Sequence, residues 1–327
     1  MRDDTVRCWN SAALGGPVVF PQERALRRAT HVAGLDGARQ IAPVVGELRG
    51  FVVLDREGHL ALARARKRRD RSHDTVEELW NSPTPFWPDD TTATRMALVS
   101  DDNARGCTLD DERRVRCAGF GLNFIGDQLA ERNDPPHELD AARCATTLAS
   151  NSMCVCAVTQ NGRVVCWGGG NGVVCAPGRD QGGAQPPTEV AGLRDVVDVS
   201  LGGALACAVT RDGALRCWGR DARCAGDAET CVMRSLPPVA HVSITGDYAC
   251  ALTREGEVRC WRASSEEAGP RAVAGLRGIT QVRTASESAC ALRDDGAVWC
   301  WGDIRERVNR EGEVETARVV RPTRVRF

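Results

Sequence analysis

The chain has 327 residues and sets 43 basic side chains against 44 acidic ones, a formal net charge of -1. This balance excludes an overall attraction to nucleic acid or to an anionic membrane, so any charged partner must be met by a local patch. No stretch approaches the roughly 18 apolar residues of a membrane-spanning helix, and the first thirty residues carry charges where a secretory signal has its apolar segment.

The first elements in the chain are short strands, which the 33 glycines and scattered valine-rich runs favour over long helices. Residues 4–9 end in Val-Arg-Cys-Trp, which is also the ending of hairpins found further along the chain. Residues 51–63 keep the alternating pattern of such a hairpin but contain no cysteine. We therefore expect the chain to begin with two degenerate copies of a repeated hairpin.

An insertion at 65–95 interrupts this pattern and carries a basic run followed by aromatic residues among prolines. A basic run is typical of a solvated connector, but it can also capture an acidic partner or a polyanion. The aromatic residues are candidate contact anchors, unless they fold onto their own blade. The candidate contact residues are Arg66, Lys67, Arg68, Arg69, Trp80, Phe86 and Trp87.

From residue 107 onward one phrase recurs five times, with two cysteines separated by nine residues. The copies span 107–117, 156–166, 207–217, 250–260 and 290–300. Cys8 and Ala61 occupy the position of the second cysteine in the two degenerate copies. Including them, successive second-cysteine positions lie 40 to 56 residues apart, the length of one four-stranded propeller blade. Helical periodicity is absent, which argues against an α-solenoid.

The phrase predicts a hairpin with a definite register. In 250–260, a three-residue loop that ends at Gly256 places Leu252 opposite Val258 and Cys250 opposite Cys260. Opposed sulfur atoms on one face of a hairpin are the geometry of a cross-strand disulfide. The expected bridges are Cys107–Cys117, Cys156–Cys166, Cys207–Cys217, Cys250–Cys260 and Cys290–Cys300.

Six cysteines remain outside these pairs. They are Cys8, Cys144, Cys154, Cys175, Cys224 and Cys231. Cys224 and Cys231 bracket an insertion that a bridge would close, and Cys175 can pair with either Cys144 or Cys154; the cysteine nearest the start lacks a partner. Oxidised pairs predict an exported protein, with reduced and buried cysteines in an intracellular protein as the alternative. A zinc site is disfavoured because Cys-x-x-Cys pairs are missing and only five histidines are available.

A tryptophan follows the second cysteine in most copies and points to the opposite face of its strand. We expect these side chains to pack between adjacent blades rather than to stack on a ligand. The set comprises Trp9, Trp167, Trp218, Trp261 and Trp301.

The phrase, together with the loop Gly-Leu-Asn-Phe-Ile-Gly-Asp-Gln-Leu at 121–129, resembles the regulator of chromosome condensation repeat family. The resemblance runs from about Cys8 to the end and is strongest over 156–302. The cysteine pairs are similar to those of a disulfide-bearing variant in bacterial, exported members. The resemblance implies an all-β fold, a seven-bladed β-propeller of four-stranded blades.

The whole of 1–327 is then a single domain with 65–95 as an inserted loop. Its units are centred near 1–10 together with 318–327, and near 51–64, 107–119, 156–168, 207–219, 250–262 and 290–302. Residues 321–325 resemble the opening strand of a further unit, and residues 4–9 lack the first strand of their hairpin. We expect an incomplete terminal blade and a natural start upstream of Met1.

No catalytic constellation is evident in the sequence. The five histidines are scattered, and the glycines at 168–172 fit a blade connector better than a phosphate loop. We expect a non-catalytic scaffold that binds a protein or a surface glycan through rim loops, with no cofactor, metal or nucleic acid, as a monomer outside the cell or in its envelope. The longest expected loops are 64–95, 119–142, 168–190 and 219–238.

Two other functions remain open. The resemblance also covers guanine-nucleotide exchange factors, so an intracellular regulator of a small GTPase is one alternative. The eroded loops and the lack of a basic tail disfavour it. A propeller lyase or hydrolase is the other alternative, and the single tyrosine, Tyr248, disfavours it.

Overall fold

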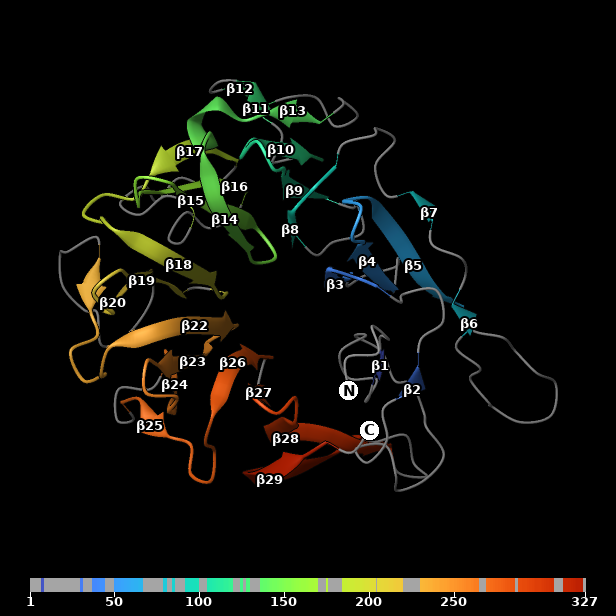
Figure 1. The fold of residues 1–327 in the computed structure, drawn as a ribbon, viewed down its shortest axis with the longest axis vertical. Coiled ribbons are helices and arrows are strands. Elements are labelled where there is room, and N and C mark those ends of the chain that lie inside the picture. Colours follow the sequence, from blue (N-terminus) through green and yellow to red (C-terminus); the bar gives the residue numbers. More distant parts are fainter. Residues whose placement is uncertain are drawn as a thin grey trace.

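The structure is a computed structural model, and the residues that it describes form an all-β ring. These residues are 7–8, 30–31, 37–44, 50–66, 79–80, 84–85, 92–99, 105–119, 124–125, 128–129, 136–169, 175, 184–203, 205–219, 230–264, 269–285, 288–308 and 314–325. Their regular structure is β-strand apart from one 3-10 helix at Asp140–Ala142. Six antiparallel sheets stand side by side around a common axis (Figure 1).

Each sheet is one propeller blade, and the blades follow one another in chain order. Blade 1 contains β3 (Gln40–Val44), β4 (Gly50–Leu54), β5 (Leu60–Arg66), β6 (Leu79–Trp80) and β7 (Thr84–Pro85). Blade 2 contains β8 (Arg95–Val99), β9 (Arg105–Leu109), β10 (Val115–Ala118) and β13 (His137–Glu138). Blade 3 contains β14 (Ala145–Ser150), β15 (Cys154–Thr159), β16 (Val164–Gly168) and β17 (Gln185–Glu189).

The last three blades repeat the same order. Blade 4 contains β18 (Val196–Leu201), β19 (Leu205–Thr210), β20 (Leu215–Gly219) and β21 (Cys231–Val232). Blade 5 contains β22 (Val239–Thr245), β23 (Tyr248–Thr253), β24 (Val258–Arg262) and β25 (Arg271–Ala272). Blade 6 contains β26 (Ile279–Thr284), β27 (Ser288–Arg293), β28 (Val298–Val308) and β29 (Val314–Arg324). A small ribbon of β11 (Phe124–Ile125) and β12 (Gln128–Leu129) lies between β10 and β13 in the chain.

The expectation of seven blades is wrong, because the described residues form six. At the start of the chain, β1 (Arg7–Cys8) pairs only with β2 (Thr30–His31), and this two-stranded ribbon lies between blades 1 and 6 (Figure 1). At the other end, residues 321–325 do not open a further unit. Residues 321–324 belong to the fourth strand of blade 6, where Thr323 lies opposite Cys300. Five residues separate β28 from β29 in the sequence, and so short a connection makes antiparallel pairing with the neighbouring strand the least costly closure.

The predicted hairpin register is confirmed. Leu252 pairs with Val258 and Cys250 with Cys260. Gly256 closes the turn with φ +81°, in the left-handed region that glycine adopts without a steric penalty. The backbone N–H of Gly256 donates to the carbonyl of Thr253 at 3.0 Å. In blade 2 the same position is held by Arg113 at φ 62°, so one hairpin keeps its register without the glycine.

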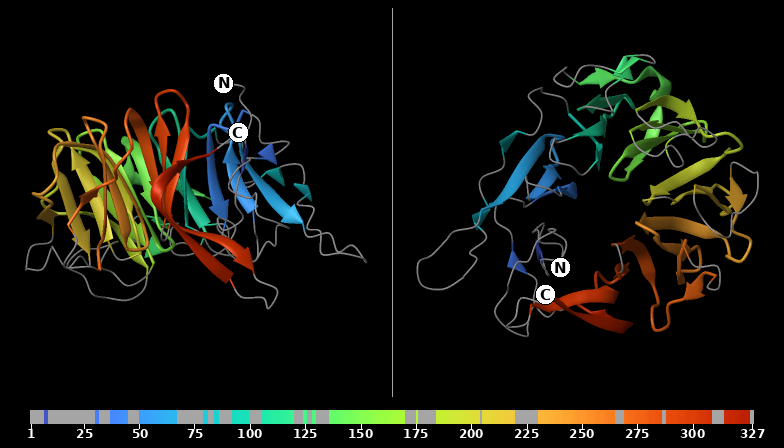
Figure 2. Two further views of the ribbon diagram at one scale, coloured as in Figure 1. Left: turned by 90° about the horizontal axis from the view of Figure 1, so that it is seen from below. Right: turned by 180° about the vertical axis from the view of Figure 1, so that it is seen from behind.

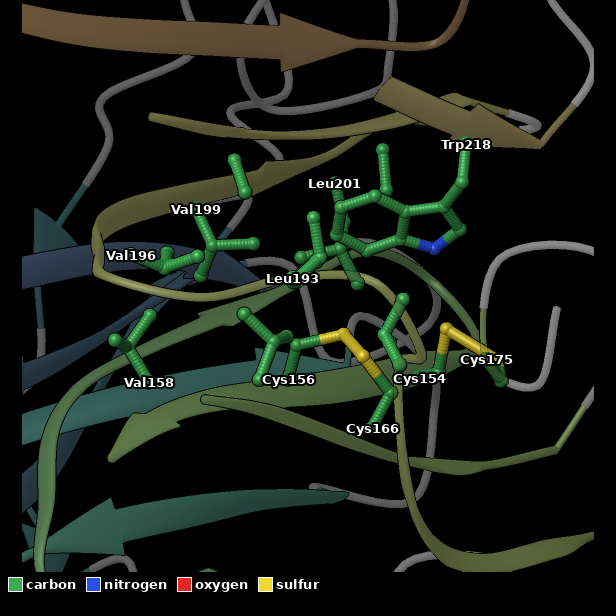
Figure 3. Close-up of a cluster of buried hydrophobic side chains, with 14 residues drawn as sticks. Cys154, Cys156, Val158, Cys166, Cys175, Leu193, Val196, Val199, Leu201 and Trp218 are labelled. Atoms are coloured by element: carbon green, nitrogen blue, oxygen red, sulfur yellow. A yellow bond between two sulfur atoms is a disulfide. The ribbon is translucent and has the colours of Figure 1, made fainter. Parts of the chain in front are cut away.

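The core is divided into clusters between neighbouring blades. Cys156, Val158 and Cys166 of blade 3 pack against Trp218 of blade 4, which is 1% exposed (Figure 3). Leu193, Val196, Val199 and Leu201 complete this cluster. Trp167, Trp261 and Trp301 pack in the same way against blades 2, 4 and 5. Packing of the tryptophans between blades is therefore confirmed for these four, whereas Trp9 lies outside the described residues.

Six disulfides join described cysteines. Five are the expected hairpin bridges, in which the Cα atoms of the paired cysteines lie 4.0 to 4.1 Å apart. The sixth joins Cys154 to Cys175, which decides between the two partners that the sequence left open. Cys231 is disulfide-bonded and Cys224 lies outside the described residues, while Cys144 is free and exposed.

Candidate binding surfaces

The first strand of every blade lies nearest the axis of the ring and has one edge that no other strand covers (Figure 1). Side chains of the preceding blade cap this edge. Gln40 Oε1 accepts from the N–H of Met96 at 2.9 Å, and Ser200 Oγ accepts from the N–H of Ile244 at 3.0 Å. Because an exposed strand edge otherwise invites pairing with another chain, these caps both satisfy the backbone and tie one blade to the next.

Three of these inner strands also carry a hydrogen-bonded relay of ionisable side chains. The Asp198 carboxylate on β18 contacts His241 Nδ1 on β22 at 2.6 Å, and it also accepts from the N–H of Val242 at 3.2 Å. An N–H of Arg283 on β26 bonds the other ring nitrogen, His241 Nε2. A guanidinium can only donate, so Nε2 must accept, and the ring proton sits on Nδ1 and is donated to Asp198. In this arrangement His241 is neutral.

An aspartate that orients a histidine is also the arrangement found in nucleophilic catalysis. Here, however, the nitrogen that would act as the base is engaged by Arg283. The nearby hydroxyl of Ser243 shares a 3.1 Å hydrogen bond with Thr284 Oγ1. The relay as built therefore positions charge and does not activate a nucleophile.

Sequence reasoning missed this relay because its members lie 43 and 42 residues apart. A usable signal was nevertheless present in the repeat. Asp198 lies opposite Val209 and His241 opposite Leu252, which are equivalent register positions in blades 4 and 5. Aligning the inner strands with one another, in addition to the cysteine phrases, brings the two residues together.

A second candidate surface is the face of the ring from which the long loops leave. In each blade the connection from the third to the fourth strand starts and ends on one face, because the four strands alternate in direction. Each of the four loops expected to be longest contains this connection, and the four connections start and end on the same face, here called the loop rim. Figure 2 shows the blades edge-on, with their strands running between the two faces.

The structure describes only part of the predicted contact residues. Arg66 is the last residue of β5 and pairs with Leu79 of β6, and Trp80 pairs with Ala65. Both candidates thus lie at the outer edge of blade 1, where the connection 67–78 begins and ends. The other candidates, Lys67, Arg68, Arg69, Phe86 and Trp87, are outside the described residues.

The described residues lack two kinds of feature, a metal-binding cluster and a membrane-spanning helix. No three of their His, Cys, Asp or Glu side chains are grouped closely enough to hold a metal ion. None of their helices has the length and apolar character to cross a membrane.

Comparisons with known proteins bear on the fold and the repeat. A model of the regulator of chromosome condensation (RCC1) repeat matches residues 196–223, which begin with β18 of blade 4. No curated protein matches the sequence. Human WBSCR16 is a similar solved structure, with a TM-score of 0.69 and 19% identity over 100% of this chain and 94% of that one.

Two yeast structures are similar as well. Prp20p of Saccharomyces cerevisiae, described with its binding to Gsp1p and histones, has a TM-score of 0.67 and 16% identity over 98% of this chain and 85% of that one. Yeast RCC1 (Prp20) bound to Kap60 has a TM-score of 0.64 and 16% identity over 92% and 78%. At such identities the likeness concerns the fold, and the repeat match supplies the sequence link. The chain is a β-propeller whose residues 196–223 match the regulator of chromosome condensation repeat.

Proposed function

We propose that the protein is a non-catalytic scaffold that binds a protein partner at the loop rim and works in an oxidising compartment outside the cytoplasm. The observation that carries the proposal is the topology of the connections from the third to the fourth strands, which start and end on one face of the ring. Loops on a rigid frame are where binding residues concentrate. Arg66 and Trp80 at the base of one such loop are of the residue types enriched at contact sites.

The frame beneath the rim is stiff in ways that suit such a role. Buried tryptophans link consecutive blades, and polar side chains cap the inner strands of the next blade. Five disulfides between described cysteines tie the second strand to the third in blades 2 to 6, and a sixth ties β15 to Cys175 in the connection between β16 and β17. Disulfides persist in exported proteins and are reduced in the cytosol, which supports an extracellular or envelope location.

A protein is a better candidate ligand than a surface glycan because the solved structures of the same fold include complexes or binding studies with proteins. Exchange on a small GTPase receives less support. Six pairs of described cysteines are joined in disulfides, which an intracellular regulator would not maintain.

The test is affinity capture from the native source with matched loop variants. One variant replaces 67–78 with a Gly-Ser linker and another replaces 220–229. The control exchanges the charged turn residues Arg254 and Glu255, which lie on the opposite face, for serine. A protein captured by the parent and the control but lost from the loop variants supports the proposal. Equal capture by all four, or loss from the control alone, would contradict it.

The compartment is tested separately by mapping thiols in protein isolated from its native location. Peptide mapping under non-reducing conditions is expected to find the six bridges intact. Sixteen free thiols would contradict the oxidised scaffold and favour an intracellular regulator instead.

A further inference from the structure

The exposed surface of the six inner strands, here called the axial surface, is basic. These strands carry four ionisable side chains, namely Arg95, Asp198, His241 and Arg283. With the histidine neutral, two arginines and one aspartate give these strands a net positive charge. Both arginines are exposed, and neither forms an ion pair with a carboxylate in the described part of the chain. The axial surface therefore attracts anions, and its cations are available to them.

Arg283 is held in a fixed orientation that leaves part of its guanidinium free. Its NH1 group donates to the carbonyl of Val282 at 3.0 Å and to His241 Nε2. Among the described residues, Nε–H and the NH2 group have no acceptor. These parallel N–H groups match the two oxygens of a carboxylate. Because the contact of NH1 with the Val282 carbonyl restricts the side chain before a ligand arrives, and does so in either protonation state of His241, less rotamer freedom is lost on binding.

We propose that Arg283 is a binding site for a carboxylate, presented by an acidic side chain of the partner, and that protonation of His241 strengthens this site. The source of the carboxylate rests on the proposed function, whereas the site itself rests on the relay. Asp198, His241 and Arg283 together are neutral when His241 is neutral. A proton on Nε2 makes their sum positive and removes the acceptor of the Arg283 N–H, which frees that group for the ligand as well.

The charges that face His241 make this coupling direct. Four strands pack against β22: β18, β19, β23 and β26. Among their side chains, β18 contributes Asp198, β26 contributes Arg283 and β23 contributes Tyr248, and the cysteines of β19 and β23 are in disulfides. Asp198 accepts from Nδ1–H of the His241 ring in either protonation state, and the proton added at Nε2 lies on the side of Arg283.

The site can be tested with acetate by NMR on protein labelled with ¹⁵N in its arginine and histidine side chains. Titrations at about pH 8 and about pH 5.5, on either side of the ordinary histidine pKa, use chloride to hold the ionic strength constant. Acetate is expected to shift the Arg283 Nε–H resonance and to bind about tenfold more tightly at the lower pH, since one added charge acts at close range. Without acetate at the higher pH, His241 is expected to carry its proton on Nδ1.

Variants separate the parts of the proposal. Arg283→Gln should abolish the response to acetate, and His241→Gln should retain it but lose the pH dependence. Arg163→Gln is the control, since Arg163 lies in the turn before β16 and pairs with Glu189 of the outermost strand of blade 3. A parent protein that does not respond to acetate, or whose affinity is the same at both pH values, would overturn the proposal.

The two proposals can fail independently. If acetate binds as expected but the captured partner is held equally well by Arg283→Gln, the carboxylate does not come from the partner and that assignment is wrong. If acetate binds and the loop variants retain every partner, the proposed function fails while the site stands.

Discussion

The turn glycines of blades 4 and 6 offer a matched pair for measuring how blades constrain one another. Gly213 and Gly296 hold the same hairpin position, at φ +92° and +82°. A Cβ on Gly213 would lie 2.8 Å from Pro238 Cβ and 3.0 Å from its Cα, whereas a Cβ on Gly296 would meet nothing within 4 Å. Pro238 cannot move away freely because the next residue, Val239, donates its N–H to the Gly213 carbonyl at 2.8 Å.

The substitutions Gly213→Ala and Gly296→Ala should therefore differ in cost. The left-handed backbone penalty, about 1–2 kcal/mol, applies to both. The contact with Pro238 adds about 1–3 kcal/mol to Gly213→Ala alone, as overpacking does in a filled core. Urea unfolding with the disulfides intact, monitored by tryptophan fluorescence, gives the midpoint of the unfolding transition for each variant. Equal losses, or a larger loss for Gly296→Ala, would refute the argument that the blade 4 turn is packed against the start of blade 5.

Three further predictions concern single hairpins. Arg113→Gly removes the left-handed strain of a non-glycine residue in the blade 2 turn and should raise the free energy of unfolding by about 1 kcal/mol. The same urea assay measures this change, and a loss of stability would contradict the prediction. Replacing Cys207 and Cys217 together by serine should cost less than the roughly 3 kcal/mol of an unconstrained loop of this length, because the turn already restricts the hairpin. Calorimetry on the double variant tests this, and a larger cost would contradict it. Hydrogen bonds from the Arg293 guanidinium, and then from the Ala297 N–H, hold the pKa of Asp295 well below its usual range. Asp295 therefore stabilises the fold above the ordinary carboxyl pKa, and this contribution is lost as the pH falls toward the lowered value. In acid titrations the free energy of unfolding should fall more steeply for the parent than for Asp295→Asn, and identical curves would contradict the pairing.

The sequence by itself determined the hairpins. Turn glycines, alternating apolar residues and cysteines nine residues apart act within a dozen residues, so Cys250 could be placed opposite Cys260 and Trp261 on the other face without a structure. Local steric rules are sufficient at this range because the register of a hairpin follows from the length of its turn.

The tertiary structure alone decided how the hairpins assemble. The described residues form six blades instead of seven because the last strand, β29, completes the sheet of blade 6, an outcome of competing pairings that no local pattern encodes. Cys175 pairs with Cys154 because its side chain meets it in the cluster between blades 3 and 4. The contact of His241 with Asp198 exists only because closure of the ring brings successive inner strands side by side. Each of these results depends on residues far apart in the chain, whose proximity is a property of the ring and not of any one repeat.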